Sequence, residues 1–452
     1  MKRWLPILLI LFATTLSLIT CSLKHYKTVG VEEKGVDKEL SSIPLLSELN
    51  YIYETYISEN RNYTTRLYLS HFLSNDYKNS DLFFDNHHRS IALKPETDKK
   101  TVKEVKAKVI SAGSGCSTIV RFIRRIIPGY LSKKKKPRVL VIGDSVTSGY
   151  GSESNKSENW MPSQYWAYAK MFFELEKIDN GNKADEYNAL FIGSWTDGSF
   201  TIHHNGVDRR VKAMAEGYGG ASLEQLFKPI FGNAYLPNRF YDETKGTFSI
   251  KSYLSKYRTM DDNGERLVSS KINPAGECVK GTDGKEYVIG TEITSQDRLS
   301  KVDVCTPSII VINLCHNTTL KNYQKNIGPV LNTINKELPD TKVVLMTIDE
   351  AGTLFPTDYP NYAASQITYT GLHEKNAAIY NYLKEKVENE SKGVYVFASQ
   401  FVMPTMESVP SIEKEGKYGK DSSVIAPNYH PNNKAHEVWG YALYSLIKWI
   451  IS

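Results

Sequence analysis

Short continuous runs of apolar residues recur along the last two-thirds of the chain and alternate with longer amphipathic segments. The runs predict strands that are buried on both faces of a sheet, at residues 138–142, 189–193, 308–314, 343–348 and 394–397. Helical spacing of apolar residues predicts helices at residues 164–175, 320–338, 373–387 and 434–450. Strands that alternate with helices are typical of parallel crossover connections, so the pattern predicts a doubly wound α/β sheet.

The first third of the chain has a different pattern. Between residues 50 and 93 short apolar and aromatic runs are broken by Asn, Asp and Ser. Over residues 102–110 apolar and polar residues alternate approximately. This pattern favours a tether and a small β-rich module over residues 21–136, ahead of a main domain at residues 137–452. We interpret the basic stretch from Arg121 to Arg138 as a solvated linker. The alternative is a contact with lipid head groups or an acidic polymer.

The amino terminus has the order of a secretory signal peptide. Met1, Lys2 and Arg3 precede an apolar stretch at residues 4–13 that is short for a membrane span. Residues 18–21, Leu-Ile-Thr-Cys, resemble the bacterial lipobox. We therefore predict a lipoprotein signal peptide at residues 1–20, lipidation of Cys21, and anchoring to the bacterial cell envelope at the outer membrane or periplasmic face. The alternatives are an uncleaved anchor and an ordinary signal peptide with an incidental cysteine.

Composition and cysteine usage narrow the class of protein. The 452 residues are 41% hydrophobic and 23% charged, which suits a globular chain with a sizeable core. The net charge of +6 is modest and no nucleic-acid motif accompanies it, so we expect no nucleic-acid partner. If Cys21 is lipidated, Cys278 and Cys305 could form a disulfide. Cys315 closes an apolar strand, so we predict that it is a buried thiol. No cysteine pair has CxxC spacing, so no metal cluster is indicated.

Four polar blocks stand out against this background. The first, Gly143-Asp144-Ser145, ends the strand predicted at residues 138–142. The others are the glycine-rich turn at residues 217–222, the strand end at residues 313–317, and residues 428–432 just before the last helix. Open α/β sheets bind ligands beyond the carboxyl ends of their strands, where such blocks would lie. Each block alone also fits a plain alternative: a polar turn, a turn glycine, a strand-end cap or a surface-loop histidine.

Taken in order, the serine, glycine, asparagine and histidine blocks resemble the GDSL/SGNH hydrolase superfamily over residues 138–452. The resemblance implies an α/β fold with a flavodoxin-like doubly wound parallel sheet, preceded in many extracytoplasmic relatives by a β-sandwich-like domain. It also implies a serine esterase with Ser145 as nucleophile and His430 as base. The oxyanion hole would consist of the backbone N–H groups of Ser145 and Gly220 and the side-chain amide of Asn317. No metal and no cofactor would be needed.

These residue types suit ester hydrolysis. A serine hydroxyl is a weak nucleophile until a base removes its proton, and a histidine can take that proton and return it to the leaving group. The tetrahedral oxyanion needs donors that are placed in advance. A glycine allows close approach of the backbone, and an asparagine amide donates without fixing a charge at the site.

Two positions depart from the family pattern. Thr318 stands where the third block usually has an aspartate, and Pro427 stands where the last block usually has the aspartate that orients the histidine. Asp421, Glu437 or a backbone carbonyl could take over that role. A backbone carbonyl would leave a Ser–His dyad.

We therefore expect an exported, lipid-anchored serine esterase that removes O-acyl, most often O-acetyl, groups from carbohydrate or from a small ester. The substrate class follows from the resemblance and the location. We expect residues 238–241, inside the long span at residues 231–299, beside the substrate cleft. Pro427 and Thr318 favour one alternative, a lipoprotein that binds glycan without hydrolysing it. The predicted anchor and the basic stretch favour another, a lipase or phospholipase acting on membrane lipid.

Overall fold

The computed structural model describes two parts of the chain, an amino-terminal group of strands and a larger α/β body. The described residues are 48–54, 65–68, 82–84, 90–93, 101–111, 117–126, 136–149, 162–179, 181, 189–232, 236–262, 264, 267–269, 278–280, 286–289, 304–347, 375, 378–388, 392–398, 431 and 433–452. All structural statements below concern these residues.

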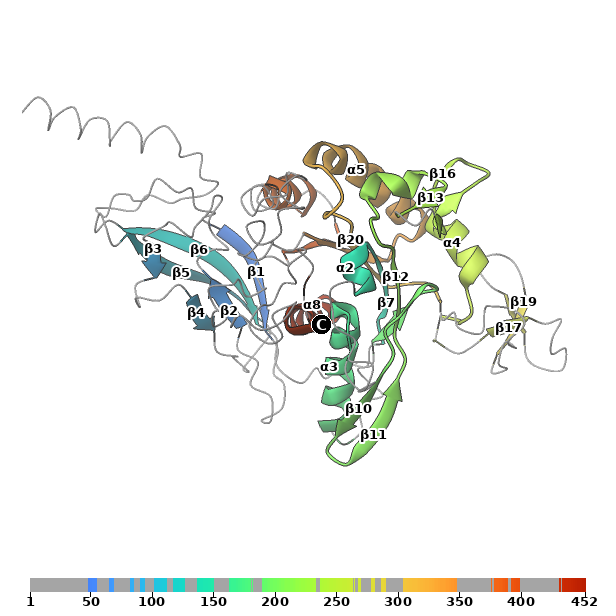
Figure 1. Cartoon of the computed structure of the whole chain (residues 1–452), viewed down its shortest axis with the longest axis horizontal. Coiled ribbons are helices and arrows are strands. Elements are labelled where there is room, and N and C mark those ends of the chain that lie inside the picture. The colour runs from blue at the N-terminus through green and yellow to red at the C-terminus, as the bar shows by residue number, and fades with distance from the viewer. Residues whose placement is uncertain are drawn as a thin grey trace, which may run out of the picture.

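The α/β body is built on a seven-stranded sheet in which parallel pairs predominate (Figure 1). Its strands are β7 (Arg138–Gly143), β8 (Leu190–Ile192), β9 (Thr196–Asp197), β12 (Met214–Gly217), β20 (Ile309–Asn313), β21 (Lys342–Met346) and β22 (Val394–Phe397). The order is β22, β21, β20, β7 and β12, with β9 antiparallel at the β12 edge and β8 also paired with β7. β20 is buried at every position, as expected for a central parallel strand. The predicted alternation of strands and helices around a mostly parallel sheet is confirmed.

The strand beside β7 is divided into two pieces. β8 pairs with the first half of β7, and β12 pairs with its last residues, Ile142 and Gly143. Between the two pieces the chain forms β9 and the antiparallel hairpin of β10 (Phe200–His204) and β11 (Val207–Val211), which projects from the sheet in Figure 1. No pattern in the sequence predicted this hairpin between the two strand pieces.

Helices cover the sheet and complete the body. They are α2 (Ser145–Ser148), α3 (Tyr165–Asp179), η2 (Leu223–Phe227), α4 (Ile250–Tyr257), α5 (Leu320–Glu337), the π-helical η4 (Leu383–Glu388) and α8 (Asn433–Ile451). α3 and α8 pack together through aromatic rings, with Phe173 and Tyr444 in edge contact at 4.7 Å between centroids. The helices predicted at residues 164–175, 320–338 and 434–450 correspond to α3, α5 and α8.

The described part of the chain before residue 127 consists of strands. They are β1 (Glu48–Glu54), β2 (Thr65–Tyr68), β3 (Leu82–Phe84), β4 (Ser90–Leu93), β5 (Thr101–Ser111) and β6 (Ser117–Ile126), on one side of the molecule in Figure 1. β6 lies between β1 and β5, so the interpretation of the basic stretch as a solvated linker is wrong over its first residues. Phe122 and Arg124 of β6 are buried, because alternate side chains of a strand face the interior. The guanidinium of Arg125 lies 5.9 Å from the ring centre of Trp449 on α8.

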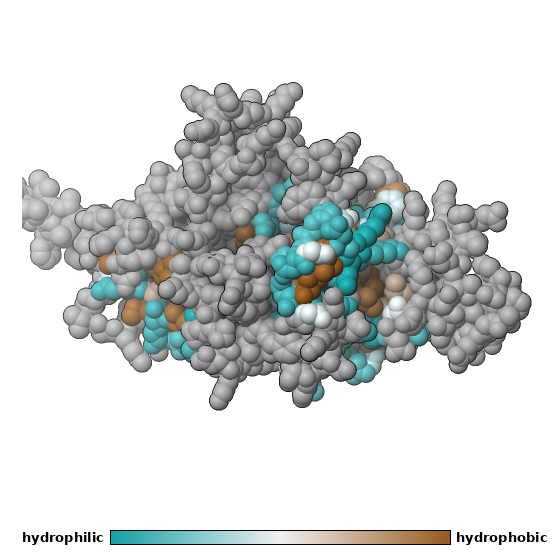
Figure 2. All heavy atoms as spheres, turned by 90° about the horizontal axis from the view of Figure 1, so that it is seen from below, coloured by the Kyte–Doolittle hydropathy of each residue, from teal (hydrophilic) through white to brown (hydrophobic). Residues whose placement is uncertain are grey.

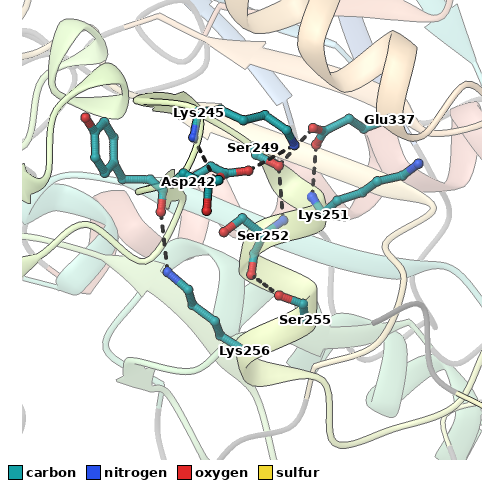
Figure 3. Close-up of polar contacts among 10 residues, drawn as sticks. Asp242, Lys245, Ser249, Lys251, Ser252, Ser255, Lys256 and Glu337 are labelled. Atoms are coloured by element: carbon teal, nitrogen blue, oxygen red, sulfur yellow. Dashed lines mark hydrogen bonds and ion pairs between the residues drawn. The ribbon is translucent and has the colours of Figure 1, made fainter. Parts of the chain in front are cut away.

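The long span after residue 230 contains short elements. Besides α4 they are β13 (Ile230–Phe231), β14 (Leu236–Pro237), β15 (Tyr241–Asp242), β16 (Thr247–Phe248), β17 (Leu267–Ser269), β18 (Cys278–Lys280) and β19 (Glu286–Ile289). Glu337, the last residue of α5, fixes the start of α4 (Figure 3). Its carboxylate accepts hydrogen bonds from the hydroxyl of Ser249 at 2.8 Å and the backbone N–H of Lys251 at 2.9 Å. α4 is therefore tied to the main body at its amino end.

Cysteine chemistry agrees only partly with expectation. Cys315 is a buried free thiol, as predicted. Cys305 is also a buried free thiol, so the disulfide considered between Cys278 and Cys305 is not formed. Among the described residues, no helix combines the length and apolarity needed to cross a bilayer. No group of three or more His, Cys, Asp or Glu side chains within these ranges is arranged to hold a metal ion.

Candidate functional site

Three of the four polar blocks meet at the carboxyl ends of three neighbouring strands. β7 ends at Gly143, whose backbone pairs with Gly217 at the end of β12 on one side. On its other side Gly143 pairs with Asn313 at the end of β20. Because parallel strands end at the same edge of a sheet, the serine, glycine and asparagine blocks leave the sheet side by side.

The serine block turns directly into α2. Asp144 is the N-cap of this helix, and its carboxylate accepts a hydrogen bond from the backbone N–H of Val146 at 3.0 Å. Ser145, the first helical residue, is half-buried. α3 holds α2 in place, since the indole of Trp166 donates to the carbonyl of Thr147 at 2.8 Å. The serine therefore stands on a rigid turn.

Two glycines permit this turn because α2 packs against their backbone. A Cβ atom at Gly143 would lie 1.9 Å from the hydroxyl oxygen of Thr147. A Cβ atom at Gly217 would lie 2.6 Å from the backbone nitrogen of Ser148. Both approaches are closer than non-bonded atoms allow, so any larger residue at these two positions would displace the helix that carries Ser145.

The glycine block forms a tight turn beside the serine. The backbone N–H of Tyr218 donates to the carbonyl of Gly143 at 2.9 Å, which joins the two blocks directly. Gly220 has a φ of 73°, in the left-handed region that glycine adopts at least cost. Gly219 is exposed and Gly220 half-buried, so the turn faces outward.

The asparagine block is bonded to the glycine block. The side-chain nitrogen of Asn317 donates to the carbonyl of Ala221 at 3.1 Å. An amide nitrogen carries two hydrogens, so this bond leaves a second one for another acceptor. Thr318, which departs from the family pattern, is buried and links the same two segments. Its hydroxyl donates to the carbonyl of Leu314 at 2.5 Å and accepts from the backbone N–H of Leu223 at 2.9 Å.

A buried carboxylate underlies the glycine block. Glu216 has no exposed surface and accepts hydrogen bonds from the backbone N–H and hydroxyl of Ser194 and from the hydroxyls of Tyr218 and Tyr253. Burial raises the pKa of both tyrosines well above the usual value, and the charge of Glu216 raises it further. Both phenols therefore remain protonated donors. The carboxylate joins β12, α4 and Ser194, the second residue after β8, at one point.

The described structure resembles several solved structures along most of their length. A carbohydrate esterase family 2 enzyme with a carbohydrate-binding domain, from Corynascus thermopiles (Myceliophthora fergusii), has 13% sequence identity and a TM-score of 0.31, over 86% of this chain and 88% of its own. A carbohydrate esterase family 3 protein from Talaromyces cellulolyticus has 12% identity and a TM-score of 0.33, over 70% of this chain and 98% of its own. A protein from Parabacteroides merdae described as a GDSL-like lipase has 11% identity and a TM-score of 0.31, over 70% and 96%.

No family model and no curated protein matches the sequence. Because the TM-scores lie near 0.3, the comparisons give no residue-by-residue correspondence. The roles proposed for Ser145, Gly220 and Asn317 therefore rest on contacts within this chain alone.

The structure places the candidate residues unevenly. Ser145, Gly220 and Asn317 lie at one edge of the sheet, on segments that are hydrogen-bonded to one another. His430, the predicted base, lies outside the described residues.

The other residues considered for orientation or lipidation fare similarly. Asp421, Pro427 and Cys21 also lie outside the described residues. Glu437 is described on α8, where its charge adds to burial in raising the pKa of Tyr168. The histidine beside it, His436, is fully buried, and its Nδ1 accepts from the backbone N–H of Tyr165 at 3.2 Å. These contacts make His436 a structural residue.

Sequence reasoning missed Glu216 and its partners. The available signal was a lone carboxylate between Ala215 and Gly217, in a short segment with no other charge. A buried charge of this kind needs several donors, but the sequence does not show where they come from. Ser194 and Tyr253 lie 22 and 37 residues from Glu216 along the chain, and only the fold brings them together.

Proposed function

We propose that the protein is a serine esterase of the SGNH type that hydrolyses O-acyl, chiefly O-acetyl, esters of carbohydrate. The observation that carries this proposal is the meeting of three blocks at one sheet edge. Ser145, Gly220 and Asn317 retain solvent-accessible surface there, while the residues that hold them are buried. A purely structural turn would not need a nucleophile type and amide donors together at the ligand-binding edge of an α/β sheet.

The mechanism follows from the roles of these groups. The hydroxyl oxygen of Ser145 attacks the ester carbonyl while His430 takes its proton. The oxyanion accepts hydrogen bonds from the backbone N–H groups of Ser145 and Gly220 and from the second amide hydrogen of Asn317. His430 then protonates the leaving alcohol, and water releases the acyl group from the serine by the same steps in reverse order.

One alternative keeps the fold without the reaction: a glycan-binding protein. Thr318 favoured that alternative from the sequence, but its contacts supply a structural reason for the substitution. It holds the asparagine block against the glycine block through Leu223 and Leu314. Pro427 remains the one feature on the side of a binder. A lipase acting on membrane lipid is the other alternative, and acyl-chain length separates it from the proposed activity.

Location and fold details belong to the same proposal. Lipidation of Cys21 would anchor the enzyme to the cell envelope, and the mass of the mature amino terminus checks it. We interpret the strand order β8/β12, β7, β20, β21, β22 as the flavodoxin-like arrangement. We also interpret the strands before residue 127 as the separate β-rich module of residues 21–136, which limited proteolysis would release if it folds by itself.

Replacement of the nucleophile tests the function. We expect Ser145→Ala and His430→Ala each to lower kcat/KM for para-nitrophenyl acetate and for acetylated polysaccharide by at least about a thousandfold. Ser255→Ala is the matched control, because Ser255 lies on α4 and its hydroxyl bonds only the helix carbonyl of Ser252 in the described contacts. It should keep wild-type activity and, like Ser145→Ala, the wild-type circular dichroism spectrum.

Two results would count against the proposal. Turnover that survives in pure Ser145→Ala protein would reject the nucleophile. A wild-type protein that cleaves para-nitrophenyl palmitate faster than the acetate would favour a lipase instead.

A further inference from the structure

One tryptophan differs from the others that the structure describes. Trp166 and Trp439 are buried and Trp449 is half-buried, whereas 43% of the surface of Trp195 is exposed. An indole is a costly group to leave in water, and large exposed aromatic rings often mark contact surfaces. On the face shown in Figure 2, the described residues form both apolar and hydrophilic patches.

Trp195 lies next to the proposed active site. Its ring stacks on that of Tyr218, with centroids 5.7 Å apart and planes 7° from parallel, and Tyr218 belongs to the glycine-rich turn. On β13, Phe231 meets the Tyr218 ring edge-on at 4.9 Å, and it directly follows the exposed Ile230. Two of the four large apolar side chains that are exposed in the described structure therefore flank this turn.

A cationic donor accompanies the indole. The guanidinium carbon of Arg239 lies 4.9 Å from the ring centre of Trp195 and 4.7 Å from that of Tyr257 on α4. Its Nη1 donates to the carbonyl oxygen and the hydroxyl of Ser194, at 2.8 and 2.5 Å. Both bonds are made by Nη1, one of the three guanidinium nitrogens. The N–H groups on Nε and Nη2 diverge from it within the guanidinium plane.

The pair is held rigidly before any ligand arrives. The hydroxyl of Ser194 accepts a hydrogen bond from Arg239 and donates one to the buried Glu216, so it links the two opposite charges. α4, which carries Tyr257, is in turn fixed by Glu337 at its amino end (Figure 3). A preorganised surface loses little side-chain freedom when it binds.

We infer that Trp195 and Arg239 form the carbohydrate subsite of the proposed esterase, which accepts a pyranose ring next to the acylated hydroxyl. A pyranose presents C–H groups on its face and hydroxyl oxygens around its edge. An indole beside guanidinium N–H groups offers the matching apolar area and donors. A long acyl chain would instead need a continuous apolar groove and would gain nothing from Arg239. The inference rests on the proposed function only for the position of the ester.

The test compares a sugar ester with a sugarless one. We expect Trp195→Ala to lower kcat/KM for acetylated xylan, or for acetylated glucomannan or pectin if one of these is cleaved faster, by about tenfold, mainly through KM. The value for para-nitrophenyl acetate should change by less than about twofold. Trp195→Phe should keep most of the polysaccharide activity, and Ile119→Ala, an exposed apolar residue of β6, is the matched control.

A binding measurement separates this inference from the proposed function. In the Ser145→Ala background, Trp195→Ala should weaken calorimetric binding of the deacetylated oligosaccharides of the same polysaccharide by about tenfold. If the wild type cleaves no ester but binds these oligosaccharides through Trp195, the esterase proposal fails and the subsite stands. Equal loss on both esters, no loss on either, or no binding of any of the three oligosaccharides would overturn the subsite.

Discussion

At the scale of residues, the site depends on positions where a side chain is missing. Gly143 and Gly217 have no Cβ atom, and the backbone of α2 and the side chain of Thr147 occupy the space that one would need. Ser145 is therefore positioned by the small size of the two residues on which its helix packs. Thr318 makes the converse contribution, because one hydroxyl bridges two segments at the same edge.

Pro427 gives a prediction at this scale. If a backbone carbonyl orients His430, Asp421→Asn and Glu437→Gln should each keep most of the activity. Pro427→Asp should raise kcat/KM by about tenfold or more, since a carboxylate stabilises the imidazolium by charge and a carbonyl only by its dipole. The measurement is the pH–rate profile of the wild type and the three variants.

A loss of about four decades in Asp421→Asn alone would contradict the dyad and make Asp421 the third catalytic group. The same loss in Glu437→Gln would assign that role to Glu437 instead. A wild-type profile in all three variants would show that the family position at residue 427 has no part in catalysis.

The sequence predicted where the candidate site residues lie better than it predicted which residues support them. Ser145, Gly220 and Asn317 follow strands in a fixed order, so a pattern along the chain finds them. Glu216 and Trp195 acquire their roles only through partners distant in the sequence. Hydroxyl and guanidinium donors of this kind occur throughout the chain, and nothing local marks the ones that meet at a site.

At the scale of elements, the pairing of α3 with α8 depends on a buried ion pair as well as on aromatic rings. The ammonium of Lys448 on α8 donates to Glu176 on α3 at 2.7 Å, and the hydroxyl of Tyr444 bonds the same carboxylate. Both charges are almost completely buried. Burial lowers the pKa of Lys448, so the carboxylate is needed to keep the ammonium charged.

We predict that breaking this pair costs more than removing it. Lys448→Met leaves a buried carboxylate without its cation and should lower the free energy of unfolding by about 3 kcal/mol. The double variant Lys448→Met with Glu176→Met should recover most of that loss. Urea denaturation measures both.

The exposed ion pair of Lys245 and Asp242, visible in Figure 3, supplies the control. Lys245→Met should leave the unfolding midpoint almost unchanged, because solvent screens this pair. If the double variant at α3 and α8 were less stable than Lys448→Met alone, the ion pair would not be the cause of the loss.

The sequence did not predict strand β6, because its arginines obscure the alternation of apolar residues. In β6 the basic residues alternate with Val120, Phe122 and Ile123 in a way that suggested a charged linker, although the strand lies inside a sheet. Arg124 is buried there, which a count of charges cannot anticipate. Runs without charge, such as β20, were predicted within a residue or two of their ends.

At the scale of the whole molecule, two parts meet at α8. β1 and β6 belong to the amino-terminal sheet. The backbone of β1 runs close to α8, and Arg125 of β6 lies over Trp449 of the same helix. The carboxyl-terminal helix therefore contacts both the sheet at the start of the chain and, through α3, the body that carries the site.

The raised pKa values of buried thiols and phenols predict that the protein loses stability at high pH. Burial raises the pKa of Cys305 and Cys315 from 9 to about 12, and that of Tyr218 and Tyr253 well above 10. The folded state holds these protons while the unfolded chain releases them. The stabilisation is thus complete below about pH 9 and is lost as the pH rises toward 12.

The urea midpoint, measured in steps from about pH 8 to about pH 11, should fall across this window. The buried Lys170 and Lys448 act in the opposite sense, because burial lowers their pKa and the folded state binds fewer protons. They are outnumbered by the thiols and phenols. A midpoint that is flat or rising to pH 11 would contradict the prediction.

The divided strand beside β7 provides a position at which the chain could accept an insertion. Where it leaves the sheet, Gly193 lies so close to the point of return that a Cβ atom there would be 2.5 Å from the backbone nitrogen of Ala215. Exit and re-entry are therefore neighbours, and the hairpin between them ends in Asn205 and Gly206, both with positive φ. Sequence inserted at that tip would lengthen the hairpin without shifting the register of Gly217. A new module could therefore be acquired here while the turn that carries Ser145 keeps its conformation.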